Sequence, residues 1–145
     1  MADAKSVTKK IKDEEIKFVD LRFTDPRGKM QHVTMDAKVM DEEAFTDGIM
    51  FDGSSIAGWK AINESDMVLK PDLDAVYTDP FSATPMLIVF CDIVEPSTGE
   101  GYARDPRTTA HQKDRRGTGR SEFSAAKRER AAFIIPMTGE YDGRR

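Results

Sequence analysis

The sequence predicts an α+β fold, a small mixed β-sheet with short helices, and three observations lead to it. Residues 16–35 alternate apolar and polar side chains in two stretches, which the turn sequence DPRG (25–28) joins. Residues 85–94 (PMLIVFCDIV) are the most apolar run of the chain, typical of a strand in the middle of a sheet. Residues 41–45 begin with three acids and are followed by Gly48, which indicates a short helix. Strands and helices in this order are typical of the α+β class.

The bulk composition is that of a soluble globular domain. A chain of 145 residues, 39% hydrophobic and 33% charged, suits one domain with a modest core. No apolar run approaches the roughly 20 residues that a transmembrane helix needs, and the charged residues 1–15 lack the apolar core of a signal peptide. The single cysteine, Cys91, excludes an intrachain disulfide and fits a reducing cytosol. We therefore expect a cytoplasmic protein in which this thiol is buried and unreactive.

The first elements are a helix and a hairpin. Residues 6–15 predict a short helix that Ser6 caps, because Val7 and Ile11 recur at helical spacing. A strand begins at residue 16, and its apolar side chains alternate with polar ones: Val19, Leu21 and Phe23. After a type I turn in which Gly28 adopts a left-handed conformation, residues 29–35 return as a second strand. One face of that strand carries Gln31, Val33 and Met35.

The later elements are shorter and interrupted by prolines. Residues 67–70 predict a strand that stops at Pro71, since proline cannot donate a ladder hydrogen bond. Residues 75–78 predict a further strand, and 85–94 the central one. Asp105 followed by proline is typical of a helix N-cap with proline in the first helical position, and the sequence RRGTGR (115–120) ends that helix early.

Residues 50–67 (MFDGSSIAGWKAINESDM) fit neither helical nor strand periodicity and predict a loop pinned by apolar residues at its ends. Glycines and serines are typical of such turns, because glycine permits positive φ and serine hydroxyls bond to turn backbone. The loop presents the carboxylate of Asp52 beside two serines, an arrangement suited to chemistry. On composition alone, an ordinary turn with Trp59 packed into the core is the preferred interpretation.

The same stretch closely resembles the loop of type I glutamine synthetases that carries their Asp-Gly-Ser-Ser element. The resemblance extends to KFVDLRFTDPRGKMQHVT (17–34), DMVLKPD (66–72) and CDIVEPSTGEGYARDPR (91–107), in the family's order and roughly its spacing. It covers about residues 11–110 and then stops. It implies that residues 1–104 form the family's N-terminal β-grasp domain, which agrees with the mixed sheet predicted above.

The resemblance also implies a function. The family joins glutamate and ammonia, using ATP to form γ-glutamyl phosphate, with Mg or Mn held by its catalytic domain. Asp52 matches the aspartate that binds ammonium and helps to deprotonate it, Ser55 the serine beside that site, and Trp59 the tryptophan that packs near it. In the family's dodecamers this loop reaches the active site of a neighbouring subunit. The implied partners are full-length synthetase subunits, glutamate and ammonium.

The rest of that chemistry is missing from the sequence. His32 and His111 are the only histidines, and neither lies at metal-ligand spacing from other ligands. We expect His32, in mid-strand, to pack against its neighbouring strand. Residues 99–101 (GEG) are too short to cradle a phosphate. The chain alone is therefore expected to bind no cofactor or metal and to be inactive, and ATP with Mg or Mn is implied only for the full-length family.

The composition changes after residue 110. Residues 1–110 carry 13 Lys and Arg against 21 Asp and Glu, whereas 111–145 carry 9 against 5. Residues 105–145 resemble no part of the catalytic domain beyond its start, so we expect an aborted start of that domain and an Arg-rich, disordered tail, as a truncation or frameshift would produce. A tail that binds nucleic acid is the functional alternative, but no aromatic interleaving or known module supports it.

Two other functions stay open at this point. One is a non-enzymatic β-grasp module that docks on intact synthetase subunits and regulates them. The other is a fragment of a related γ-glutamyl amine ligase, which shares the fold but uses another amine. The closeness of the Asp52 loop to synthetases proper favours the N-terminal part of a glutamine synthetase.

Overall fold

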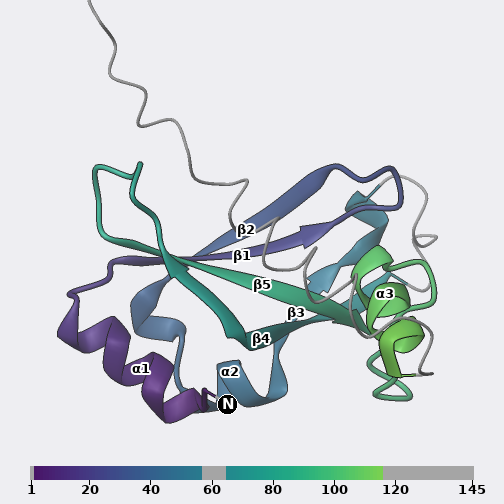
Figure 1. Cartoon of the computed structure of the whole chain (residues 1–145), viewed down its shortest axis with the longest axis horizontal. Coiled ribbons are helices and arrows are strands. Elements are labelled where there is room, and N and C mark those ends of the chain that lie inside the picture. Colours follow the sequence, from purple (N-terminus) through teal and green to yellow (C-terminus); the bar gives the residue numbers. More distant parts are fainter. Residues whose placement is uncertain (1, 57–64, 116–145) are drawn as a thin grey trace, which may run out of the picture. The chain divides into compact units, whose positions relative to one another are not determined.

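The computed structural model describes residues 2–56 and 65–115, with side chains as far as residue 110 (Figure 1). The chain divides into two compact units, Met1–Thr109 and Ala110–Arg145, and only the end of one helix is described in the second unit. Trp59 and the tail beyond residue 115, which was predicted to be disordered, lie outside the described residues. Within the described ranges, no helix is long and apolar enough to cross a membrane.

The described part of the first unit is a five-stranded sheet with short helices (Figure 1). The elements are α1 (Ala4–Asp13), β1 (Phe18–Thr24), β2 (Met30–Asp36), the 3-10 turn η1 (Ala37–Val39), α2 (Glu42–Asp47), β3 (Ile49–Asp52), the 3-10 turn η2 (Gly53–Ser55), β4 (Asp66–Thr78), β5 (Met86–Val94) and α3 (Pro106–Arg115). The strand order is β2-β1-β5-β4-β3, with β1 and β5 parallel and all other neighbours antiparallel. The predicted α+β class with a mixed sheet is confirmed.

β5 is the central strand, as the sequence predicted. Its side chains Leu87, Val89, Cys91 and Ile93 are fully buried on the face that α1 and α2 cover. On the other face of β5, Ile88 is buried, whereas Phe90 and Asp92 are half-buried. Burial raises the pKa of the Cys91 thiol well above its usual range, so the thiol stays protonated at neutral pH, as expected of an unreactive core cysteine.

The residue that caps the start of α1 is not the one that the sequence predicted. Asp3, not Ser6, is the N-cap: its carboxylate accepts from Ser6 N at 2.8 Å, and Asp3 N donates to Ser6 Oγ at 3.2 Å. Ser6 is therefore the third helical residue of a reciprocal capping box. The predicted apolar face is correct, because Val7 and Ile11 are both buried.

The predicted hairpin of β1 and β2 is confirmed. Gly28 N donates to Asp25 O at 2.9 Å and Gly28 has a φ of 81°, the left-handed conformation expected there. The Asp25 carboxylate accepts further hydrogen bonds from Arg27 N and Lys29 N, which tightens the turn. The register pairs Leu21 with Val33, so the apolar alternation of both strands faces the core.

Asp20 was expected on the polar side of β1, but it is only 2% exposed. Its carboxylate accepts hydrogen bonds from Arg22 Nε at 2.7 Å, His32 Nδ1 at 2.7 Å and Thr34 Oγ1 at 2.8 Å. Burial raises the pKa of Asp20, but these three donors outweigh it, so that the pKa is lowered overall. His32 therefore contacts the neighbouring strand β1 through a hydrogen bond to a buried carboxylate, while the rest of its side chain is largely exposed (62%).

The prediction that a strand stops at Pro71 is also wrong, because β4 continues from Asp66 to Thr78. Pro71 pairs with Cys91 of β5, whereas β3 on the other side of β4 reaches only as far as Leu69. From Pro71 onward β4 has β5 alone beside it among the described residues. A proline is tolerated at such an edge, and the register shifts between Pro71 and Val76.

The first turn of α3 is fixed to β5, and the predicted N-cap is confirmed. Asp105 is fully buried and accepts from Thr108 N at 2.9 Å, from Thr108 Oγ1 at 2.6 Å and from Ile93 N at 3.3 Å. Arg107 adds ion pairs with Asp72 and with Asp92, the latter at 2.6 Å. The compact unit consequently runs to Thr109. The proposed boundary at residue 104 stays a prediction.

Replacing Glu15 with glycine should stabilise the first unit. Glu15 has a φ of 51° at the end of α1, where Ile16 N donates to Ile11 O in the pattern that usually places glycine at this position. Glycine removes a left-handed strain of roughly 1 kcal/mol, so chemical denaturation of Glu15→Gly should show a higher free energy of unfolding. Asp13→Gly, in the helix itself, should instead lose about 0.5–1 kcal/mol. A lower free energy of unfolding in both variants would contradict this interpretation of Glu15.

Asp20→Asn should lower the free energy of unfolding by about 1–3 kcal/mol at pH 7, because a buried network loses its ionised acceptor. The pKa of Asp20 is lowered on folding, so its stabilisation is complete above its ordinary value of 3.8 and disappears as the pH falls through the lower folded value. The difference in free energy of unfolding between wild type and Asp20→Asn should therefore become smaller below about pH 3.8. Asp47→Asn, exposed at the end of α2, is the control and should change little. A gap that is constant with pH would exclude the ionised network.

Candidate functional site

The Asp52 loop begins as a strand. Residues 50–52, expected to belong to a loop, lie in β3, which pairs with the start of β4: Phe51 opposite Met67 and Asp52 opposite Asp66. The strand has only four residues, too few for the alternation to stand out from the Gly-Ser-Ser sequence that follows. Its pairing fixes the backbone of Asp52 to the edge of the sheet.

The turn after Asp52 approaches β4 closely. Gly53 N donates to Ser65 O at 2.7 Å, and Gly53 is buried against Met67, which is itself fully buried. A Cβ atom at Gly53 would lie 2.5 Å from Met67 Sδ and 3.1 Å from Ser65 O. The absence of a side chain at Gly53 therefore permits the close approach of this turn to β4.

The carboxylate of Asp52 is exposed, and its strongest hydrogen bonds come from Ser54. Its Oδ1 accepts hydrogen bonds from Ser54 N at 2.8 Å and from Ser54 Oγ at 2.7 Å. The Ser54 hydroxyl and amide lower the pKa of Asp52, and a weaker contribution comes from the Ser65 side chain. The group is thus an accessible anion at neutral pH, able to bind a cation and to accept its hydrogen bonds. Sequence reasoning missed Ser54 and Ser65, although Asp-x-Ser is a known turn signal.

The other two predicted site residues are less defined. Ser55 is the last residue of η2 and is exposed, and no hydrogen bond of its side chain is found within the described residues. Ile56 is half-buried against the core, and its amide donates to Gly53 O at 3.1 Å, which anchors this end of the turn as expected. Trp59 lies outside the described residues. The structure therefore brings Asp52 and Ser55 into one turn but does not test their roles.

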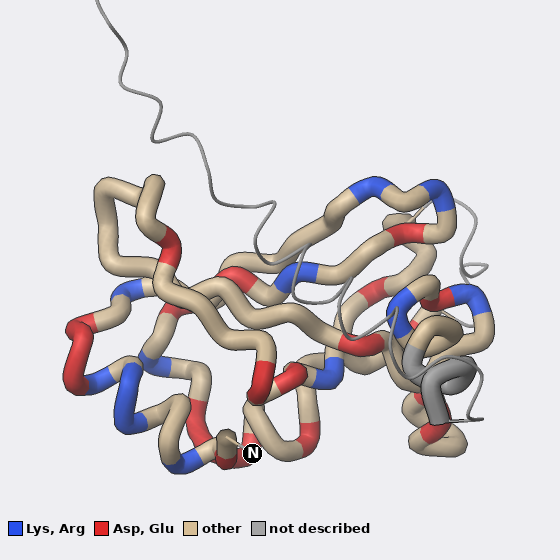
Figure 2. Tube along the Cα trace, in the orientation of Figure 1, with Lys and Arg blue, Asp and Glu red and all other residues tan. Residues whose placement is uncertain are grey.

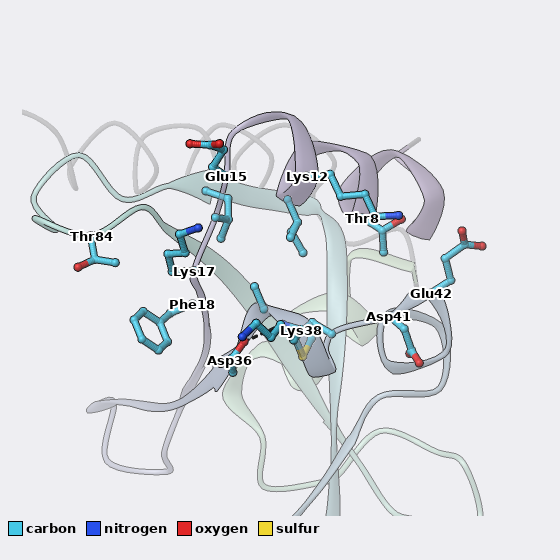
Figure 3. A pocket seen from close by; sticks show the side chains of 14 residues that line it. Thr8, Lys12, Glu15, Lys17, Phe18, Asp36, Lys38, Asp41, Glu42 and Thr84 are labelled. Atoms are coloured by element: carbon cyan, nitrogen blue, oxygen red, sulfur yellow. Dashed lines mark hydrogen bonds between the residues drawn. The ribbon is translucent and has the colours of Figure 1, made fainter.

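A separate groove of about 820 Å³ lies between α1, η1 and the start of β1 (Figure 3). No residue of the Asp52 loop lines it. Its charged side chains are mixed in sign: Lys12, Lys17, Lys38, Glu15, Asp36, Asp41 and Glu42. Asp36 and Asp41 already cap η1 and α2. The groove therefore offers no concentrated charge for an ionic substrate.

The charges of the described residues do not favour nucleic acid or a metal cluster. Figure 2 shows Lys and Arg interspersed with Asp and Glu along the described trace. In residues 2–56 and 65–115, no group of three or more His, Cys, Asp or Glu side chains could hold a metal ion. The described part of the chain consequently does not fit the divalent metals that the resemblance implies for the full-length family.

Residues 15–96 match the family model described as "Glutamine synthetase, beta-Grasp domain", which is more than half of the chain. The chain belongs to this family. It is 62% identical over 110 residues to the glutamine synthetase of Rhizobium meliloti (strain 1021) and 61% identical to that of Bradyrhizobium diazoefficiens. In each case the match covers 76% of this chain and 24% of the relative. The chain thus spans about a quarter of the length of these curated relatives and corresponds to their N-terminal part.

Solved structures agree on the fold. The cryo-EM structure of Plasmodium falciparum glutamine synthetase superposes with a TM-score of 0.69 at 24% identity, covering 81% of this chain and 23% of that one. Apo GmaS without ligand gives a TM-score of 0.68 at 20% identity, with 83% and 27% covered. At these identities the likeness concerns the fold alone. It supports the β-grasp arrangement that the strand order shows.

Gly53→Ala should destabilise the first unit by about 1–3 kcal/mol, because its new Cβ would overlap buried Met67. Chemical denaturation of Gly53→Ala, Met67→Ala and the double variant tests the contact. The cost of Gly53→Ala should be smaller in the Met67→Ala background, by about 1 kcal/mol, because the overlapping atoms are then gone. If the losses in free energy of unfolding of the two single variants simply add in the double variant, β3 and β4 do not approach each other as described.

Proposed function

We propose that this chain is the β-grasp part of a glutamine synthetase whose Asp52 loop completes the ammonium site of a neighbouring subunit. Membership of the family supports the proposal, and the observation that carries it is the exposed, ionised Asp52 at a turn fixed to β4. Family resemblance supplies the identity of the cation, and the geometry supplies an anion that can bind one.

In this proposal Asp52 binds ammonium through charge-assisted hydrogen bonds and accepts one of its protons. The ammonia that is released attacks the γ-carbonyl carbon of γ-glutamyl phosphate, so that a C–N bond forms and phosphate leaves. Ser55 offers a neutral acceptor beside the same cation, and Trp59 packs near the shared site. ATP with Mg or Mn supplies the activation of glutamate and belongs to the catalytic domain of full-length enzymes.

The remaining parts of the proposal concern assembly. Residues 1–104 form the β-grasp domain, and residues 105–145 the start of the next domain and an Arg-rich tail. The functional state is a homo-oligomer with full-length subunits in the cytoplasm, as the family resemblance implies. The exposed carboxylate of Asp52 is open to a neighbouring subunit in such an assembly.

Asp52→Asn tests the proposal in a chimaera of residues 1–110 with the remaining part of the Rhizobium meliloti synthetase, which is 62% identical over the grafted segment. Asparagine keeps the size and removes the charge and basicity, so amide synthesis should fall by about 10²–10⁴-fold while ATP binding and assembly persist. Asp47→Asn should retain synthesis.

The 145-residue chain without the added part serves as a second control and should form no γ-glutamyl product. Near-normal synthesis by the Asp52→Asn chimaera would show that the loop is structural and would refute the proposed role of Asp52.

A further inference from the structure

The direction of the Asp52 carboxylate depends on hydrogen bonds rather than on packing. The backbone beneath it is fixed, because β3 pairs with β4 and Gly53 N donates to Ser65 O at 2.7 Å. The side chain itself is exposed beyond the last strand residue. An exposed aspartate has several staggered rotamers of similar energy, so only its hydrogen-bond donors can select one of them.

Ser54 supplies two of these donors to one oxygen. Its amide and its hydroxyl both reach Asp52 Oδ1, at 2.8 Å and 2.7 Å. The Ser54 backbone is in turn held in η2, which the hydrogen bond from Ile56 N to Gly53 O closes. Two donors on the same oxygen fix the plane of the carboxylate, whereas one donor would leave it free to rotate.

We infer that Ser54 is a positioning residue for Asp52 and presents its carboxylate to the bound cation in one orientation. The inference rests on the proposed function of Asp52. Sequence resemblance directed attention to Ser55, but in the structure the Ser54 amide and hydroxyl are the groups that donate to Asp52 Oδ1. Ser54 itself does not touch the cation and acts through the carboxylate.

The hydroxyl of Ser54 also stabilises the charged form of Asp52 and heads the causes of its lowered pKa. Removing the hydroxyl in Ser54→Ala leaves the Ser54 amide and the weaker contribution of the Ser65 side chain, so the pKa of Asp52 should rise. Ser54→Thr keeps a hydroxyl on the same carbon and should preserve most of the effect. Ser82→Ala is a matched control, because Ser82 lies in another surface turn, where its hydroxyl accepts from Thr84 N at 3.3 Å.

The first measurement is an NMR titration of the Asp52 carboxyl carbon in the 145-residue chain. Ser54→Ala should raise the pKa, Ser54→Thr should lie near wild type, and Ser82→Ala should match wild type. The amide pattern of each variant reports whether the fold is kept. An unchanged pKa in folded Ser54→Ala would overturn the inference, because the hydroxyl would then not bond to the carboxylate in solution.

The second measurement is the KM for ammonium in the chimaera described above. Ser54→Ala should raise this KM by roughly three- to tenfold, with a smaller change in kcat and in the KM for ATP, and Ser54→Thr should restore it. A normal ammonium KM in Ser54→Ala, beside a defective Asp52→Asn chimaera, would overturn the inference alone. Normal synthesis by Asp52→Asn would overturn the proposed function and, with it, the significance of Ser54 for catalysis.

Discussion

The register of β5 between its two neighbours is the constraint on which the rest of the structure depends. β5 pairs in parallel with β1, placing Leu87 opposite Val19, and antiparallel with β4, placing Ile93 opposite Leu69. β4 in turn fixes β3 and therefore Asp52. Because side chains alternate with a period of two, a slip of one residue between β4 and β5 would turn the buried apolar side chains of the displaced strand away from the core. The burial of β5 thus determines where the candidate site lies, although no residue of β5 belongs to it.

Two aspartates on this sheet differ in how their environment leaves the carboxylate available to a ligand. Asp20 is 2% exposed, and its carboxylate accepts hydrogen bonds from Arg22, His32 and Thr34. Its charge is therefore stabilised inside the fold and is not accessible to a ligand. Asp52 is exposed, and both the amide and the hydroxyl of Ser54 donate to its Oδ1. Both have a lowered pKa, for the same reason: hydrogen bonds stabilise the charged form. Exposure, rather than the direction of the pKa shift, identifies Asp52 as the carboxylate that is available to a ligand.

Local patterns in the sequence predicted the hairpin, α2, β5 and the Asp105 cap, because each depends on residues within one turn or one strand. The errors arose where a distant strand decides the outcome. Pro71 stays in β4 because β3 pairs with β4 only as far as Leu69. Asp20 is buried because β2 places two donors, His32 and Thr34, against it. In the candidate site, Asp52 and its loop could be found from sequence, but the choice of Ser54 over Ser55 depends on side-chain rotamers. Trp59 lies outside the described residues, so its role stays a prediction.

A lowered pKa makes Asp52 a good ligand for a cation and a weak base, which sets two requirements of the proposed reaction against each other. In the exposed loop, the lowered pKa of Asp52 favours binding of the cation over acceptance of its proton. Covering the loop with a second subunit would remove water from the carboxylate, and desolvation raises the pKa of an acid. Bound ammonium opposes that rise, because a nearby positive charge favours the anion. Ammonium has no lone pair, so its proton must pass to Asp52 before the C–N bond can form, and removal of water from the carboxylate in the assembled site favours that transfer. On this view the isolated loop is built to hold the cation, and its basicity develops in the assembled site during the reaction.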